Sequence, residues 1–559
     1  AGEDFQQGIL LGAPGGAGRS TLGQRAYPEH GGTLTLRAGG SLHGVAPTLD
    51  FNLDAAEFPR QLVSSWLVRQ GNADGADRAT GWTVAPEWFE QGIAALAGGD
   101  ITIDAGGDLV NLSVASASIG RQVGGTTAAL SEVEETGGGE LQIRVGGDVR
   151  GGVFYLGKGT AKLAAAGSLV GGRPLSPGAD ALLYPVLALG ASAFDIQALE
   201  SVTLSAVVNP TFIAQGPVQK QPINRTRNSY FVSYSDASRV GIQAFNGDIT
   251  LQEGAQLAGG AFENDFSGAV DSLPLRVYPP TLEAVAVSGN ITLDGSFTLF
   301  PSTAGNLRLL AGDSVFLNAS FGLSDADPAG LPGIQAPLSF ATPDSVSAVL
   351  KLLDPTPSAG ALASTPLHAN HDAALAVIVA NTGDVVSALG ALTFLSRPAE
   401  IAAGQDLINP YFWIQNTLVS DVSVFKAGRD IRYESQRVAT DSTIGFPGYL
   451  LPLTSGIELW GPGRLVLETG RNLDLGTGSG IISRGNSVNG ALQGPGGAVS
   501  VFAGLGTRGL NFDAFIQRYF ETGSYTVQLP GLADLSPAEA LAALKNLPPE
   551  RQLQPVLDA

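Results

Sequence analysis

Seven aspartates that follow glycine turns are the residues with the clearest chemical potential. They are Asp108, Asp148, Asp248, Asp313, Asp384, Asp406 and Asp430. Aligned on one face, their carboxylates could bind Ca²⁺ or cleave glycosidic bonds. Each one, however, follows a glycine corner in the same repeated phrase, where an Asp side chain can hydrogen-bond the turn backbone. We therefore interpret all seven as structural turn residues and keep a polysaccharide lyase or hydrolase as the enzymatic alternative.

Two groups of aromatic residues are the candidate binding residues. Trp82 and Trp88 lie in the non-repetitive stretch 45–99, and Tyr411 and Trp413 form a second aromatic group. Flat rings can stack on sugars, but they equally fill the core beneath a loop. The sequence does not separate these two interpretations.

Other catalytic and metal chemistry finds little support. The chain has no cysteine and no methionine, which excludes disulfides, thiolate nucleophiles and cysteine zinc sites. His368 and His371 form a His-x-x-His pair, but it lies in a Pro/Ala-rich loop with no glutamate or third ligand beside it. We read that stretch as a solvated loop, and we expect no cofactor and no metal.

Charge and hydropathy narrow the class of partner. Lys and Arg number 31 and Asp and Glu 51, so the net charge is 31 − 51 = −20. An acidic surface repels phosphate backbones, and we expect no nucleic-acid partner. The longest apolar run, 373–380, falls short of the ~20 residues of a membrane helix. Residues 1–11 lack the basic start and apolar core of a signal peptide, so we expect any export signal to lie outside the chain.

A short phrase repeats along the chain: an alternating strand, a glycine turn, then a second strand. Thr33–Leu42 and Asp100–Leu109 are two of its copies. Its turn glycines include Gly107, Gly147, Gly247, Gly312, Gly383, Gly404, Gly428 and Gly470. Several of their spacings are one or two multiples of about 21, for example 40 between Gly107 and Gly147 and 21 between Gly383 and Gly404. Strand-and-turn repeats of this length are typical of a β-solenoid.

The repeat predicts an all-β fold, a right-handed parallel β-helix with about 21 residues per coil. Alternation such as Ile101 and Ile103 places one side of each strand inward, and we expect the turn glycines to adopt positive φ. Some 20 coils would give a rod on the order of 100 Å long.

Breaks in the repeat define the predicted organisation. We expect a β-helix over 1–510, with insertions at about 45–99, 209–240 and 322–372. The segment 511–559 loses the repeat, and we expect a helix over 536–547. Ser536 and Glu539 have the spacing of a capping box, and Pro537 takes the first helical position.

With these motifs in hand, the chain resembles the filamentous-haemagglutinin-like exoproteins of Gram-negative bacteria. The phrases 105–109, 427–431 and 469–476 are similar to that family's degenerate repeats, and 461–486 resembles an uncharacterised domain near the C-terminus of some members. The resemblance implies export through an outer-membrane transporter of the two-partner route. The family's Asn-Pro-Asn signature is missing, since Asn209-Pro and Asn409-Pro are followed by Thr and Tyr, so transporter contact cannot be placed on this chain.

These features together predict an extracellular or cell-surface adhesin or biofilm-matrix segment, a rigid spacer that binds a host or matrix glycan or protein receptor. The first alternative is a filament subunit that associates end to end, since open solenoid ends template pairing. The second is the β-helical polysaccharide lyase or hydrolase.

Overall fold

The structure is a computed structural model of the whole chain. It describes residues 31–44, 63–70, 81–84, 86, 89, 92–124, 131–172, 182, 184–212, 229–252, 277–334, 338–339, 365–369, 374–434, 456–476, 478–487, 489–506 and 535–546. Everything below concerns these residues.

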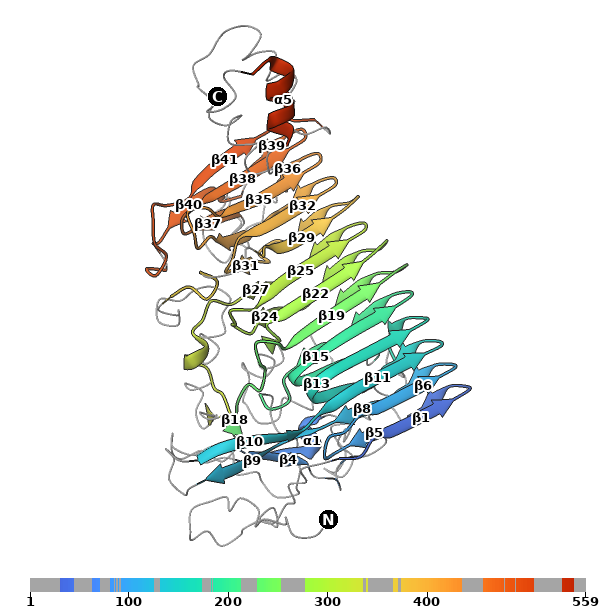
Figure 1. The fold of residues 1–559 in the computed structure, drawn as a ribbon. Helices are drawn as coiled ribbons and strands as arrows, with labels where there is room; N and C mark the ends of the chain where they lie inside the picture. Colours follow the sequence, from blue (N-terminus) through green and yellow to red (C-terminus); the bar gives the residue numbers. More distant parts are fainter. Residues whose placement is uncertain are drawn as a thin grey trace, which may run out of the picture.

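Thirteen parallel strands, one from each coil, stack in chain order into the main sheet (Figure 1). They are β1 (Leu34–Ala38), β6 (Ile101–Ala105), β11 (Gly139–Val145), β13 (Val153–Ala165), β15 (Val186–Ala198), β19 (Arg239–Ala244), β22 (Thr281–Ala286), β25 (Asn306–Ala311), β29 (Ala376–Ala380), β32 (Ala399–Ala403), β35 (Val422–Ala427), β38 (Arg464–Thr469) and β41 (Ala498–Phe502). This stacking confirms the parallel β-helix expected from the repeat.

A second parallel sheet of 12 short strands follows the first turn of each coil. Its strands are β2 (Leu42–His43), β7 (Leu109–Val110), β12 (Val149–Arg150), β14 (Leu169–Val170), β16 (Val202–Leu204), β20 (Ile249–Leu251), β23 (Ile291–Leu293), β26 (Val315–Leu317), β30 (Val385–Ser387), β33 (Leu407–Ile408), β36 (Ile431–Arg432) and β39 (Leu473–Asp474).

The third side changes character along the axis. In the C-terminal half it is a separate seven-stranded parallel sheet. That sheet comprises β21 (Val277–Tyr278), β24 (Phe297–Leu299), β27 (Phe321–Leu323), β31 (Thr393–Leu395), β34 (Phe412–Gln415), β37 (Gly456–Trp460) and β40 (Gly480–Gly485). In the N-terminal half the third side is built by β5 (Gly92–Ala95), β8 (Ser113–Ser116), β17 (Ala206–Val208) and the first residues of β13 and β15, all of which pair within the main sheet.

Alternating apolar side chains of these strands fill one continuous core. In β6, for example, Ile101 and Ile103 are buried while Thr102 and Asp104 face outward. The register places like residues above one another, as with Ile101, Leu141 and Ala161. Each coil therefore buries its apolar face against its neighbours at the ~4.8 Å strand spacing.

The register corrects our interpretation of the long spacings. The shortest coils take 20 to 24 residues, as from Leu141 to Ala161 and from Ile401 to Phe425, in line with a repeat near 21. Ile103 pairs directly with Ile143, and Ile242 with Ala284. The spacings of 40 and 42 are thus single coils that carry an insertion, not two coils. Thirteen strands at ~4.8 Å give an axis of about 60 Å, shorter than the sequence suggested.

The predicted insertions lie between coil strands with slightly different bounds. Residues 45–99 fall between β2 and β6, and 209–240 between β17 and β19, although β19 already begins at Arg239. The stretch 322–372 falls between β27 and β29, but β27 ends at Leu323. It includes a 3-10 helix, Pro328–Gly330, and β28 (Leu338–Ser339), which pairs with β18 (Ser229–Tyr230).

An antiparallel sheet forms an added layer at the N-terminal end. Its four strands are β3 (Leu67–Gln70), β4 (Gly81–Val84), β9 (Ser118–Gly124) and β10 (Ser131–Gly137), and α1 (Val63–Trp66) precedes them (Figure 1). A second apolar cluster joins this layer to the outer side of β13, β15 and β17. The hairpin of β9 and β10 was not predicted, because its Glu-rich second strand does not carry the repeat.

Near the C-terminus α5 (Pro537–Lys545) lies within the predicted range 536–547. The Ser536 N–H donates to Glu539 Oε2 at 3.0 Å, and the Glu539 N–H donates to Ser536 Oγ at 3.4 Å. The reciprocal pair is the expected capping box.

Candidate binding surfaces

One corner of the solenoid, between the main and second sheets, is uniform in every described coil. Its turn is always three or four residues long, as in 106–108 and 245–248. The last turn residue of each coil forms what we name the corner ladder: Ser41, Asp108, Asp148, Ser168, Ser201, Asp248, Asn290, Ser314, Asp384, Asp406, Asp430 and Asn472.

The corner ladder is a chain of hydrogen bonds that runs from coil to coil. Each side-chain oxygen accepts the backbone N–H of the ladder residue in the next coil: the Asp148 N–H donates to Asp108 Oδ1 at 2.9 Å, and the Ser168 N–H to Asp148 Oδ1 at 2.9 Å. The same bond recurs in all eleven steps between the twelve residues, at 2.7 to 3.3 Å. The turn aspartates therefore hold neighbouring coils together, where we had expected them to bond their own turn.

Asp313 is the exception among the predicted turn aspartates. The ladder residue of its coil is Ser314, whose N–H donates to Asn290 Oδ1 and whose Oγ accepts from the Asp384 N–H. The ladder position is the residue directly before the first apolar residue of the second-sheet strand, here Val315. Selecting the aspartate that follows the turn glycine therefore gives Asp313 in this coil, whereas the ladder residue is Ser314.

The turn glycines are needed for a different reason than we expected. None of Gly107, Gly147, Gly247, Gly312, Gly383, Gly404, Gly428 and Gly470 is among the described residues with positive φ. A Cβ at Gly147 would instead lie 2.0 Å from Asp108 Oδ1, and one at Gly428 would lie 2.0 Å from the Gly404 carbonyl oxygen. In these coils the preceding coil approaches so closely that a Cβ has no room, and left-handed backbone is not the reason for the glycine.

Protonation would weaken the ladder. Burial by itself would raise the pKa of Asp430, but the Asn472 backbone N–H, the Arg471 charge and the Asn472 side chain together outweigh it and lower that pKa. The charged form of Asp430 is thus the one the fold stabilises, as a structural acceptor requires.

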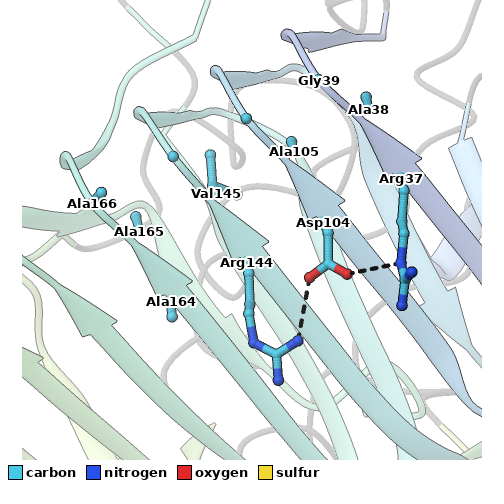
Figure 2. Close-up of a pocket in the computed structure, with 12 residues that line it drawn as sticks. Arg37, Ala38, Gly39, Asp104, Ala105, Arg144, Val145, Ala164, Ala165 and Ala166 are labelled. Carbon is cyan, nitrogen blue, oxygen red and sulfur yellow. Dashed lines mark hydrogen bonds and ion pairs between the residues drawn. The ribbon is translucent and has the colours of Figure 1, made fainter.

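The outward side of the main sheet carries ion pairs across neighbouring strands. Figure 2 shows Arg37 of β1 and Arg144 of β11 reaching Asp104 of β6 from either side, at 3.4 and 3.2 Å, beside a shallow depression of about 650 Å³. Arg37 and Arg144 are largely exposed, and such pairs contribute little to stability. Asp104 is the single acid among the residues that line this depression, and both of its carboxylate oxygens face arginines.

Trp82 is a core residue, which overturns its role as a binding aromatic. Its side chain is 1% exposed, its indole N–H donates to the Ser118 carbonyl oxygen at 3.0 Å, and its ring lies 5.4 Å from that of Phe231. It joins the added antiparallel layer to the solenoid. Trp88 lies outside the described residues.

Tyr411 and Trp413 do come together, on the outer side of the third sheet. Phe412 and Ile414 point into the core, which leaves Tyr411 and Trp413 half-buried on the opposite side. Their rings meet edge to face at 6.3 Å, and Trp413 stacks on Trp460 at 5.0 Å. We name the half-buried Tyr411 and Trp413, together with the buried Phe394 and Trp460 beneath them, the aromatic platform.

An ion pair between the exposed Arg484 and the buried Glu458 supports the platform. Arg484 donates two hydrogen bonds of 2.9 Å to the Glu458 carboxylate, which also accepts the Trp460 indole N–H at 3.1 Å. Burial first, and the Glu458 charge second, raise the pKa of Tyr411. No sequence pattern selects Trp460, Glu458 or Arg484, because only the register of β34, β37 and β40 brings them beside Trp413.

A buried polar cluster lies where three connections meet beside the third sheet. Asp325 is 3% exposed and accepts from the Gln415 amide at 2.8 Å, from the Leu367 backbone N–H at 3.0 Å and from the Asn489 amide at 3.3 Å. Burial raises its pKa to about 6 against the lowering effect of the Gln415 and Leu367 hydrogen bonds. The cluster ties the 324–334, 365–369 and 489–492 segments together.

His368 is fully buried, so the solvated loop expected around it is wrong at this residue. Its backbone carbonyl oxygen accepts from Thr417 Oγ1 at 3.3 Å, and His371 lies outside the described residues. Over the described part of the chain, no group of three or more His, Asp or Glu side chains is placed to hold a metal ion.

The same described residues contain no helix of sufficient length and hydrophobicity to cross a membrane. Comparison with known proteins adds no identity: no protein-family model, no curated protein and no solved structure matches the chain. The likeness to filamentous-haemagglutinin-like exoproteins therefore stays a prediction.

Proposed function

We propose that this chain is a β-helical segment of an extracellular adhesin or biofilm-matrix protein, a rigid spacer that carries binding elements on one side. The observation that carries the proposal is the distribution of insertions. Every described coil keeps a turn of three or four residues at the corner ladder, and every longer connection leaves from the other two corners. Surface loops are where proteins place variable contacts, while the scaffold beneath stays fixed.

Rigidity follows from the contacts between coils. Each coil joins its neighbours through at least two parallel strands, the continuous core and one link of the corner ladder. Eleven ladder bonds, each contributing about 0.5–1.5 kcal/mol, add to the backbone pairing along the whole axis. A stiff axis of this kind suits a spacer.

Binding is assigned to the aromatic platform and the turn beside it. Asp421 Oδ2 accepts the backbone N–H groups of Thr417 and Leu418, both at 2.8 Å, which fixes this turn. The turn presents Leu418 and Val419 at 41% and 66% exposure. Exposed apolar side chains on a fixed turn, next to stacked tryptophans, favour contact with a glycan or protein receptor.

The proposal places the protein on the surface of a Gram-negative cell or outside it, exported by an outer-membrane two-partner transporter. This part rests on the resemblance of the repeats. The enzymatic alternative is less favoured because the turn aspartates use their oxygens to accept backbone N–H groups.

Adhesion of coated beads under flow tests the proposal. Beads carrying the purified chain should be retained on films of bacterial biofilm polysaccharide or on epithelial cell layers, and beads carrying albumin should not. Trp413→Ala combined with Val419→Ala should reduce retention at least severalfold, while Gln405→Ala, a change at a half-buried residue of a ladder turn, should not. Retention no better than that of albumin on both surfaces would refute the adhesin function.

A specific observation favours end-to-end assembly as a second candidate function. Val499 and Val501 of the last main-sheet strand pair with the core residues Leu465 and Leu467, yet they are 36% and 43% exposed. At the other end Leu34 of β1 is 37% exposed. Exposed core positions at solenoid ends are a surface for stacking.

A further inference from the structure

A notch interrupts the outer face of the main sheet near its middle, around Gly241. Gly241 of β19 occupies a position that faces outward in every neighbouring coil. The register partners at this position in the other strands are Thr102, Gln142, Lys162, Asp195 and Glu283. The missing side chain leaves an open depression of about 500 Å³, which also borders Gln197, Arg239 and Gln243. The strands concerned, β13, β15, β19 and β22, are consecutive in the stack (Figure 1).

Two parallel amides line one side of the notch. Gln197 and Gln243 are register partners on β15 and β19, so their side chains stand about 4.8 Å apart along the axis. Each amide can both donate and accept hydrogen bonds. A pair of such groups at this spacing suits adjacent hydroxyls of a sugar.

The notch is lined by two cations, Lys162 and Arg239, and two anions, Asp195 and Glu283. Asp195 is held by Arg239, with 2.8 Å between Arg239 Nη2 and Asp195 Oδ2, and Glu283 is held by Arg308 at 3.1 Å. Lys162 is exposed beside Asp195 in the register, and no ion pair within the described residues includes it. Of the two cations of this lining, Arg239 is held by Asp195, so Lys162 is the one that can pair with an anionic group.

An exposed apolar ridge continues the same face at the start of the ladder turn. Leu199, Phe245 and Val287 occupy equivalent positions in three consecutive coils, at 47%, 40% and 51% exposure. The neighbouring coils have Ala166 and Gly312 there. Along their strands, Gln197, Gln243 and Val285 alternate with buried core residues and therefore point outward. The ridge residues follow two positions later, so the ridge lies on the same outward side as the two amides.

We propose that the Gly241 notch and the adjacent ridge bind an acidic saccharide. The ridge takes the apolar C–H face of the sugar ring, with Phe245 as its aromatic surface, and the Gln197 and Gln243 amides bind the hydroxyls. Lys162 pairs with the carboxylate. This site is separate from the aromatic platform, lies on a different sheet and does not depend on it.

Isothermal titration calorimetry with tetragalacturonate tests the site, and the fully methyl-esterified tetramer serves as the uncharged match. Gly241→Leu is the blocking variant. Gly241 has no positive φ, and a Cβ there lies 3.1 Å from Asp195 Oδ1, 3.4 Å from the end of Arg239 and 3.8 Å from the Phe194 carbonyl oxygen. Thr102→Leu, in the same outward row on β6, is the matched control. Circular dichroism verifies that each variant is folded.

The expected result is binding of the acid that weakens at least tenfold in Gly241→Leu and in Phe245→Ala and is unchanged in Thr102→Leu. Lys162→Gln should weaken binding of the acid and leave the ester unaffected. Any one of three results would overturn the proposal. These are no heat of binding with the wild-type chain, binding of the acid by Gly241→Leu as tight as by the wild type, and equal affinity of the wild type for acid and ester. Because the probe is a defined soluble sugar, this failure is distinguishable from loss of bead retention at the aromatic platform.

Discussion

At the scale of single residues, the corner ladder selects for a side-chain oxygen rather than for a charge. Asp, Ser and Asn all occupy it, and each accepts one backbone N–H from the next coil. Because Ser and Asn accept the hydrogen bond as Asp does, the aspartates alone recur at irregular intervals along the sequence. The acceptor recurs in every coil from Ser41 to Asn472, whereas the carboxylate does not.

Removal of one ladder acceptor should destabilise the solenoid measurably. Asp148→Ala leaves the Ser168 N–H without its partner, and we expect a loss of about 1 kcal/mol in the free energy of unfolding. Asp148→Asn keeps an acceptor oxygen and should lose less. Chemical denaturation of both variants measures the difference; equal losses would show that the charge, through Arg150, matters more than the hydrogen bond.

Substitution of a corner glycine should be more damaging than its backbone angle implies. Gly428→Ala places a Cβ 2.0 Å from the Gly404 carbonyl oxygen, and forced separation of coils should cost about 1–3 kcal/mol. Gly330→Ala is the matched control, since a Cβ there meets nothing within 4 Å. Thermal melting compares the two, and a near-neutral Gly428→Ala would contradict the close-approach explanation.

At the scale of elements, the third sheet separates scaffold from candidate binding surface. In the N-terminal half, the third side of the solenoid is formed by strands of the main sheet and is covered by the added antiparallel layer, where Trp66 and Trp82 are buried. Its C-terminal part carries the aromatic platform, with Trp413 half-buried. Side chains on the outer face of the third side thus pack beneath a covering layer at the N-terminal end of the axis. At the C-terminal end, the side chains on that face include the partly exposed rings of the platform.

The Asp325 cluster should make the packing of these connections depend on pH. Its folded pKa of about 6 lies above the usual value near 3.8, so the folded state holds the proton more tightly than the unfolded state. The stabilising effect is complete below the usual value and is lost as the pH rises through about 6. Hydrogen exchange of residues 489–492, corrected for intrinsic rates, should therefore be faster at pH 7.5 than at pH 5.

Asp325→Asn tests the assignment of that pH dependence. The amide stays neutral and keeps an acceptor for Gln415 and Leu367, so the variant should exchange alike at both pH values. An unchanged pH profile in Asp325→Asn would assign the effect to another group. Asp430 does not interfere, because its lowered pKa places its titration well below this window.

At the scale of the whole molecule, the repeat predicted the fold because coils of a solenoid must share their inward pattern. Ile101, Leu141 and Ala161 are in register because each fills the same core position. Insertions have no such constraint, which is why the hairpin of β9 and β10 and the 40-residue coils were misread. The sequence predicted part of the platform, because Tyr411 and Trp413 are close in sequence. Trp460 and Arg484 lie beside them only through strand pairing, which the sequence does not show.

The corrected coil count gives the molecule a defined length, and this is the last prediction. Twelve steps between thirteen main-sheet strands, at ~4.8 Å each, set a solenoid axis of about 60 Å. Cryo-electron microscopy of dilute chain should show single rods of that axial extent with a layer spacing near 4.8 Å. If the exposed Val499 and Val501 do stack on a second copy, length should grow in whole steps with concentration, and Val501→Lys should return it to one rod. An axis near 100 Å in single dilute rods would mean that the insertions form coils of their own, and the register described above would be wrong.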